Sequence, residues 1–155
     1  MDAIIQEILA ETMNIVHSDY ERQKKCKMLM LKSVCHGSFT FSLSDGTLSM
    51  LSFLFDFTAA QALDLIDNRC VLHITSPSGR ELYKVQKSAT EFHICLKNSN
   101  YCTCPSFIFH VLKKEQFMCK HKLAVMLSTA MGLCEEVQYA DETVTLMLVG
   151  GSSCH

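Results

Sequence analysis

Residues 101–123 read YCTCPSFIFHVLKKEQFMCKHKL and contain two close pairs of side chains that bind metals. Cys102 and Cys104 form the first pair, fourteen residues follow, and Cys119 and His121 form the second. Three thiolates and one imidazole are the donor set of a tetrahedral Cys₃His zinc site. A single buried cysteine would mean little, but two pairs at this separation favour metal binding over chance. We therefore predict one structural Zn²⁺ held by these four residues.

The spacing within each pair predicts the local backbone. In an extended segment, residues two apart point to the same face, so Cys102 and Cys104 can reach one ion. On a helix such residues lie about 200° apart, so Cys119 must precede a helix whose first turn contains His121. Pro105 is favoured at a first helical position, where free N–H groups stabilise a preceding thiolate. Four protein ligands predict a closed structural site without a position for substrate water.

Four lysines lie next to these ligands: Lys113, Lys114, Lys120 and Lys122. They could offset the net negative charge of a zinc centre with three thiolates. Beside a helix start held by metal, they could instead bind phosphate groups or contact a partner. The third interpretation is that these lysines simply form a basic surface exposed to solvent. His93 and His110 are weaker candidates for zinc ligands than the two pairs.

Strand patterns before the cysteines and helical patterns around them predict an α+β fold. The expected strands form an antiparallel meander over residues 70–75, 82–86 and 91–97. The expected helices cover residues 59–67, 105–113, 120–131 and 141–149, and the first begins with a capping box at Thr58 and Gln61. Two sets of apolar residues should be core: Leu51, Phe53, Leu54, Phe55 and Phe57, and then Phe107, Ile108, Val111 and Leu112.

Domain organisation follows from shifts in composition along the chain. Residues 1–20 have the apolar spacing of an amphipathic helix. Residues 21–50 are first basic and then rich in Ser without a steady period, and we interpret them as a linker or insertion. The zinc-containing domain then covers residues 51–149, with the finger at about 92–130, and residues 150–155 form a flexible tail.

Composition restricts the class of protein. The chain has 155 residues, 48% of them hydrophobic and 19% charged, which fits one domain with a real core. A net charge of -2 excludes a strongly basic nucleic-acid binder, although a local basic patch remains compatible with it. The nine cysteines, without a secretory signal or an apolar run long enough for a membrane span, indicate reduced thiols or metal ligands inside the cell.

Catalytic signatures are missing from the sequence. It contains no Ser-His-Asp arrangement, phosphate-binding loop or GxGxxG motif. A Cys-His nucleophilic pair would need an exposed, activated cysteine beside a free base. We therefore expect a protein that is not an enzyme.

The two ligand pairs, between a β-hairpin and a helix, resemble the SWIM-type zinc finger family. Further motifs are similar to one subfamily, the SWIM subunits of Shu complexes: Phe55, QALDLID at 61–67, SPSGR at 76–80, YCTCP at 101–105 and CKH at 119–121. The similarity covers residues 51–148, about two-thirds of the chain. It implies an α+β architecture of N-terminal helices, a small antiparallel meander, a zinc-bound ββα finger and C-terminal helices.

The resemblance also implies a function. A SWIM subunit of this kind would be a nuclear adaptor in homologous-recombination DNA repair, with a RecA-like recombinase paralogue as its partner. The pair would promote or stabilise recombinase filaments on single-stranded DNA, and DNA would be contacted through the complex rather than directly. The alternative is a finger that binds single-stranded DNA itself through the neighbouring lysines.

Overall fold

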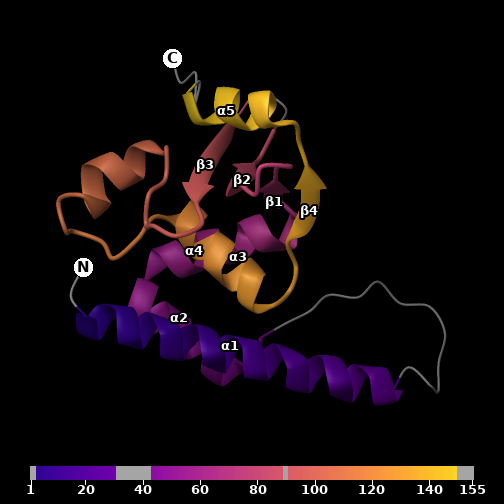
Figure 1. Cartoon of the computed structure of the whole chain (residues 1–155). Coiled ribbons are helices and arrows are strands. Elements are labelled where there is room, and N and C mark those ends of the chain that lie inside the picture. Colours follow the sequence, from indigo (N-terminus) through magenta and orange to yellow (C-terminus); the bar gives the residue numbers. More distant parts are fainter. Residues whose placement is uncertain (1–2, 31–42, 89–90, 150–155) are drawn as a thin grey trace.

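The computed structural model describes residues 3–30, 43–88 and 91–149 and has the predicted α+β fold (Figure 1). In chain order its elements are α1 (Ala3–Met30), α2 (Asp45–Phe55), α3 (Phe57–Asp67), β1 (Val71–Thr75), β2 (Glu81–Gln86), β3 (Phe92–Leu96), the π-helix η1 (Phe107–Val111), α4 (Lys120–Ala130), β4 (Glu135–Gln138) and α5 (Asp141–Val149). None of the helices described here combines the length and the apolarity that a membrane span requires.

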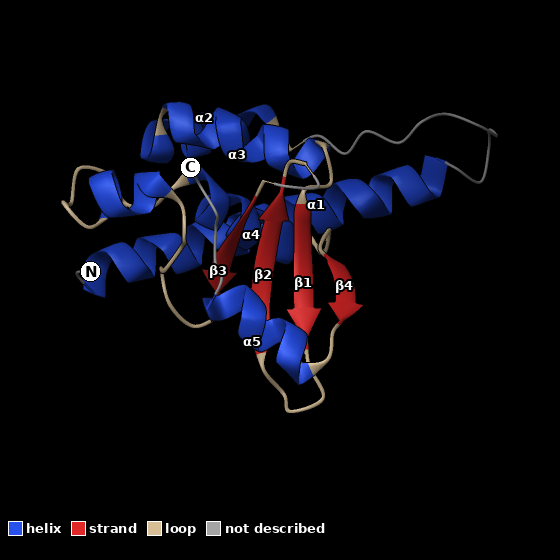
Figure 2. Cartoon of the chain, turned by 90° about the horizontal axis from the view of Figure 1, so that it is seen from above, coloured by secondary structure: helices blue, strands red, loops and turns tan. Residues whose placement is uncertain are grey.

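The four strands form one mixed sheet in the order β3-β2-β1-β4 (Figure 2). Strands β1, β2 and β3 are the expected antiparallel meander, with Tyr83 opposite both His73 and Cys95. Strand β4 pairs parallel to β1 and corrects the prediction of a purely antiparallel sheet. Its sequence, Glu-Glu-Val-Gln, lacks an apolar alternation because this edge strand is mostly exposed and is held by backbone pairing.

Helices cover both faces of the sheet. Alternate strand residues point to opposite sides, so Val85 and Cys95 face the main core with α4. Ile74 and Ile94 face the other way and pack with Val144 of α5 in a second, smaller core. Figure 1 shows α3 and α4 between the sheet and the long helix α1. The space between the sheet and α4 is therefore in the interior of the molecule.

The first helix is longer than predicted. Residues 21–30, expected to begin a linker, continue α1, and residues 45–50 belong to α2. The rest of that expected linker, residues 31–42, and the expected tail at 150–155 lie outside the described residues. The helix continues because Glu, Arg, Gln and Lys are good helix formers, and an exposed helical turn needs no apolar stripe. The assignment of domains stays a prediction.

Helix α3 starts earlier than its predicted capping box. Its first residue is Phe57, and Asp56, with φ of 47°, is both the last cap of α2 and the first cap of α3. Thr58 is therefore the second residue of α3 and not its N-cap, so the predicted capping box is wrong. The predicted apolar block is only partly buried. Leu51 and Phe55 share the buried side of α2, whereas Phe53 points away from them and is 88% exposed.

Candidate metal centre

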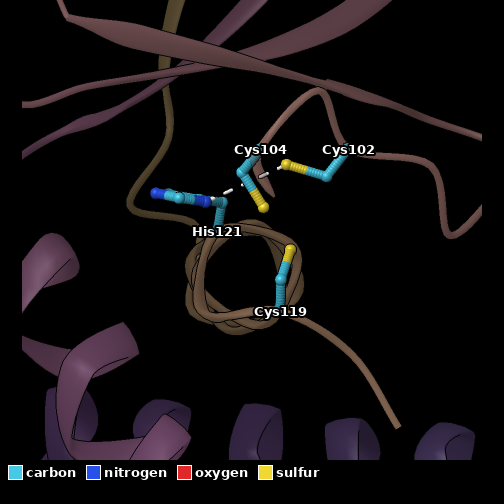
Figure 3. Close-up of side chains that lie close together, drawn as sticks. All are labelled: Cys102, Cys104, Cys119 and His121. Atoms are coloured by element: carbon cyan, nitrogen blue, oxygen red, sulfur yellow. Dashed lines mark hydrogen bonds between the residues drawn. The ribbon is translucent and has the colours of Figure 1, made fainter. Parts of the chain in front are cut away.

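The two predicted ligand pairs meet in the interior of the molecule (Figure 3). One ligand atom from each of Cys102, Cys104, Cys119 and His121 lies within 4.8 Å of the other three, and all four residues are buried. In a tetrahedral site with Zn–S bonds of about 2.3 Å, ligand atoms lie roughly 3.5–4 Å apart. The Cys102 Sγ to His121 Nδ1 distance is 3.9 Å, so the cluster could hold one zinc ion with small adjustments.

The first pair is positioned by an extended segment beside β3. Cys102 lies directly opposite Cys95 in an isolated antiparallel bridge. Hydrogen bonds flank this bridge, from Leu96 N–H to the Tyr101 carbonyl at 3.2 Å and from Thr103 N–H to the Ile94 carbonyl at 3.0 Å. The segment is therefore strand-like, as the one-residue spacing of the cysteines requires.

The second pair is positioned by the start of α4. Cys119 is the N-cap residue with extended backbone angles (φ -80°, ψ 160°), and His121 lies in the first helical turn. The backbone change between them brings both side chains to the same side, as predicted. Leu123 N–H donates to the Cys119 carbonyl at 3.1 Å, so Cys119 is held by the first hydrogen bond of the helix.

The three thiols perturb one another in the absence of metal. Hydrogen bonds with the Cys102 and Cys104 thiols lower the pKa of Cys119 strongly. Hydrogen bonds to Cys102 and Cys119, together with burial, raise the pKa of Cys104. Bound Zn²⁺ supplies the positive charge that deprotonates every coordinating thiol.

A buried histidine lies beside the cluster. His93 of β3 packs its ring against His121 with centroids 4.3 Å apart. Burial lowers the pKa of His93, and electrostatic interaction with the neighbouring His121 lowers it further. Its Nδ1 is buried and has no hydrogen-bond partner within the described residues. The sequence offered His93 as a substitute ligand, and its place beside His121, outside the four-atom cluster, makes it a packing neighbour of the site.

The four lysines do not form one patch. Lys122 is buried, and its Nζ donates to the Leu96 carbonyl at 2.8 Å. Burial lowers the pKa of Lys122. Lys113 and Lys114 are exposed in the turn after η1, whereas Lys120 is half-buried at the start of α4. Lys122 therefore serves the fold, and the predicted role as a phosphate or partner contact remains open only for the other three.

The helix expected at residues 105–113 is present but irregular. Its central turn is the π-helix η1, with a bond from Leu112 N–H to the Phe107 carbonyl at 3.0 Å. Phe107 is buried, as expected for a core position, but Ile108 and Leu112 are 53% and 62% exposed. The prediction that both are core residues is wrong, because helical periodicity identifies a shared face but not what covers it.

Comparison with known proteins agrees with this fold and centre. Residues 83–130 match the SWIM zinc finger family, a match that begins in β2, earlier than the finger predicted at 92–130. The fold and the Cys/His cluster thus define a SWIM-type zinc finger protein, and the predicted zinc cofactor fits both findings.

Three relatives illustrate the extent of this similarity. The human zinc finger SWIM domain-containing protein 7 is 43% identical over 108 residues, which are 69% of this chain and 77% of that protein. Its Danio rerio counterpart is 44% identical over 107 residues, 68% and 76% of the two chains. The Dictyostelium discoideum homolog is 32% identical over 114 residues, 72% and 73% of the two chains. The chain therefore belongs to the family of zinc finger SWIM domain-containing protein 7. No solved structure gives a significant match.

Proposed function

We propose that this chain is a non-enzymatic, zinc-binding adaptor of a Shu-type complex in homologous-recombination DNA repair. It acts in the nucleus, binds a RecA-like recombinase paralogue, and with it promotes or stabilises recombinase filaments. Membership of the SWIM zinc finger family supports this proposal. The motifs shared with Shu-complex SWIM subunits support it further, because they extend well beyond the ligands.

The buried four-ligand centre is the observation that carries the proposal. Three sulfurs and one nitrogen fill a tetrahedral coordination sphere, which is typical of a structural zinc rather than a catalytic one. Structural zinc binding releases roughly 10–16 kcal/mol in finger peptides, which exceeds the usual stability of a small domain. The ion's role is then to fix the shape of a surface, which is what an adaptor needs.

The alternative is direct binding of single-stranded DNA. It requires several free cations near stacking surfaces. Lys122 is buried and committed to the Leu96 carbonyl. Its loss from the basic cluster weakens that cluster and favours a protein partner. DNA is then reached through the recombinase paralogue.

The test is co-expression of the full chain with the RecA-like recombinase paralogue of the same genome, followed by size-exclusion chromatography. We expect a zinc-containing complex of the two proteins. A labelled oligothymidylate should bind the complex more tightly than the chain alone. Tight binding by the chain alone, with an affinity that falls steeply with salt, would support the DNA-binding alternative instead.

A further inference from the structure

A projecting segment joins the two halves of the metal centre. We call residues 105–118 the docking lobe. The preceding residue, Cys104, and the following residue, Cys119, both belong to the cluster, and their Sγ atoms lie within 4.8 Å of each other. Figure 1 shows this segment, in orange, projecting from the body of the molecule beside the sheet and α4. One bound ion would therefore close the lobe at its base.

The helical turn of the lobe is apolar on two opposite sides. Phe107 faces the core, and Val111 packs against the core from the same side. Ile108, Phe109 and Leu112 are 53%, 56% and 62% exposed on the outer side. A surface helix normally presents polar residues to water, and one that is apolar all round is normally buried. The outer side of η1 thus has the composition of a covered surface.

A groove also lies beside the lobe. A cavity of about 470 Å³ lies between the lobe and the corner of α2 and α3. Phe117 of the lobe and Phe57 of the corner both line this cavity, and they are 49% and 71% exposed. Large exposed apolar side chains gathered around a groove mark an interaction site.

The charge of the lobe indicates what covers it. Lys113 and Lys114 are exposed in the turn after η1, and neither forms an ion pair with any described residue. Glu115, the lobe's one carboxylate, lies 2.9 Å from His110 Nδ1. The lobe is therefore basic, although the whole chain carries a net charge of -2. An acidic partner complements it and is drawn to it by long-range attraction.

The apolar side chains distinguish a protein partner from nucleic acid. Two of the three outer residues, Ile108 and Leu112, are aliphatic and offer no stacking surface for bases. Aliphatic anchors beside cations match a protein segment that carries apolar side chains flanked by carboxylates.

We propose that the docking lobe is a zinc-closed binding element for such an acidic, apolar segment of the recombinase paralogue. This inference rests on the proposed function, since it names the surface by which that partner is held. Ile108, Phe109 and Leu112 bury against the partner's apolar side chains, and Phe57 and Phe117 form the groove beside them. Lys113 and Lys114 pair with the flanking carboxylates. Zinc acts indirectly, by holding both ends of the lobe.

The experiment uses the full chain and the co-expressed paralogue. An Ile108→Asp/Leu112→Asp variant places two charges on the outer side of the lobe, and a Leu146→Asp/Val149→Asp variant makes the same kind of change on the exposed side of α5. We expect the lobe variant to lose at least about tenfold in affinity for the paralogue, as is typical of central interface residues. Its zinc content and melting temperature should equal those of the wild type, and the control should bind normally.

Charge reversal and cross-linking provide independent readouts. Lys113→Glu/Lys114→Glu should weaken binding of the paralogue and reduce its dependence on salt. A photo-reactive side chain at position 109 should cross-link to an acidic segment of the paralogue, whereas one at position 146 should not. If the wild type binds the paralogue and every lobe variant binds it equally tightly, this inference is overturned while the proposed function stands.

Two further outcomes would also overturn it. A wild-type chain that never binds the paralogue would refute the proposed function together with this surface. Lobe variants that retain the paralogue but lose binding of a labelled oligothymidylate would assign the lobe to nucleic acid instead.

Discussion

The imidazole ring of His93 lies against that of His121, with the ring centroids 4.3 Å apart and the planes tilted by 47°. His93 comes from β3 and His121 from the first turn of α4, so this contact joins the sheet to the helix at the metal centre. Residues that orient a metal ligand commonly change metal affinity by 10–100-fold when they are replaced. His93 therefore belongs to the functional unit although it is not one of the four ligands.

We expect His93→Ala to weaken zinc binding by roughly tenfold or more, because the His121 ring loses the surface that orients it. His93→Phe should retain near-normal affinity, since it keeps a ring at this place and removes an Nδ1 that has no partner in the described part of the chain. Competition with a chromogenic zinc chelator measures both variants. Equal weakening by Phe and Ala would show that the nitrogen, rather than the packing, is required.

Cys104→Ser should lose stoichiometric zinc and with it the capture of the recombinase paralogue. A serine hydroxyl is a poor zinc ligand, so on the order of several kcal/mol of binding free energy is lost. Zinc analysis of the purified protein and its melting temperature report the effect. Cys134→Ser is the matched control, because that half-buried thiol lies outside the cluster, 3.7 Å from Thr129 Oγ1. Full zinc content in Cys104→Ser would contradict the ligand assignment.

Lys122→Ala should destabilise the fold without changing DNA affinity. The variant removes a buried, charged donor to the Leu96 carbonyl, which costs about 1–3 kcal/mol. Urea denaturation should detect this loss, and Lys113→Ala, at an exposed position of the same sequence cluster, should change stability little. A Lys122→Ala protein with wild-type stability and weakened oligonucleotide binding would refute this assignment.

Asp19 should make the junction of α1 and α2 sensitive to acid. Its carboxylate accepts hydrogen bonds from Ser44 N–H at 2.8 Å and Thr47 Oγ1 at 2.9 Å. Burial alone would raise the pKa of Asp19, but these hydrogen bonds hold it below the ordinary value of 3.8. A depressed folded-state pKa means that the stabilisation is present above about pH 4 and is lost as the pH falls through the folded-state pKa.

The corresponding variant is Asp19→Ala. At neutral pH we expect it to lower the free energy of unfolding by about 1–3 kcal/mol, because buried donors lose their acceptor. The difference from wild type should shrink as the pH falls below about 4 and through the lowered pKa of the folded-state carboxyl. Denaturation of both proteins at each pH measures it, and comparing them at the same pH cancels any common loss of zinc. A difference that is constant with pH would contradict the role of the charge.

Much of the metal centre could be predicted because it depends on local geometry. The one-residue spacing of Cys102 and Cys104 requires an extended segment, and that of Cys119 and His121 requires a helix boundary. Both conditions hold in the structure. Strands β1–β3 were predictable for the same reason, since their alternating side chains face two cores.

Other features depend on what packs against each element. Strand β4 is held by pairing with β1, and its side chains carry almost no apolar signal. The second half of α1 is helical although no apolar stripe marks it. Phe53 and Phe57 were predicted to belong to one buried block, but both are exposed: Phe53 lies on the side of α2 away from the buried Leu51 and Phe55, and Phe57 follows the corner at Asp56.

The sequence by itself determined the donor set, the backbone at each ligand pair and the α+β class, because residue chemistry and side-chain periodicity are properties of neighbouring residues. Only the tertiary structure decided that Lys122 is buried, that His93 supports His121 and that Ile108 and Leu112 face solvent. Those outcomes depend on which surfaces meet across the chain. Periodicity groups side chains on a face, and only packing determines whether that face is covered.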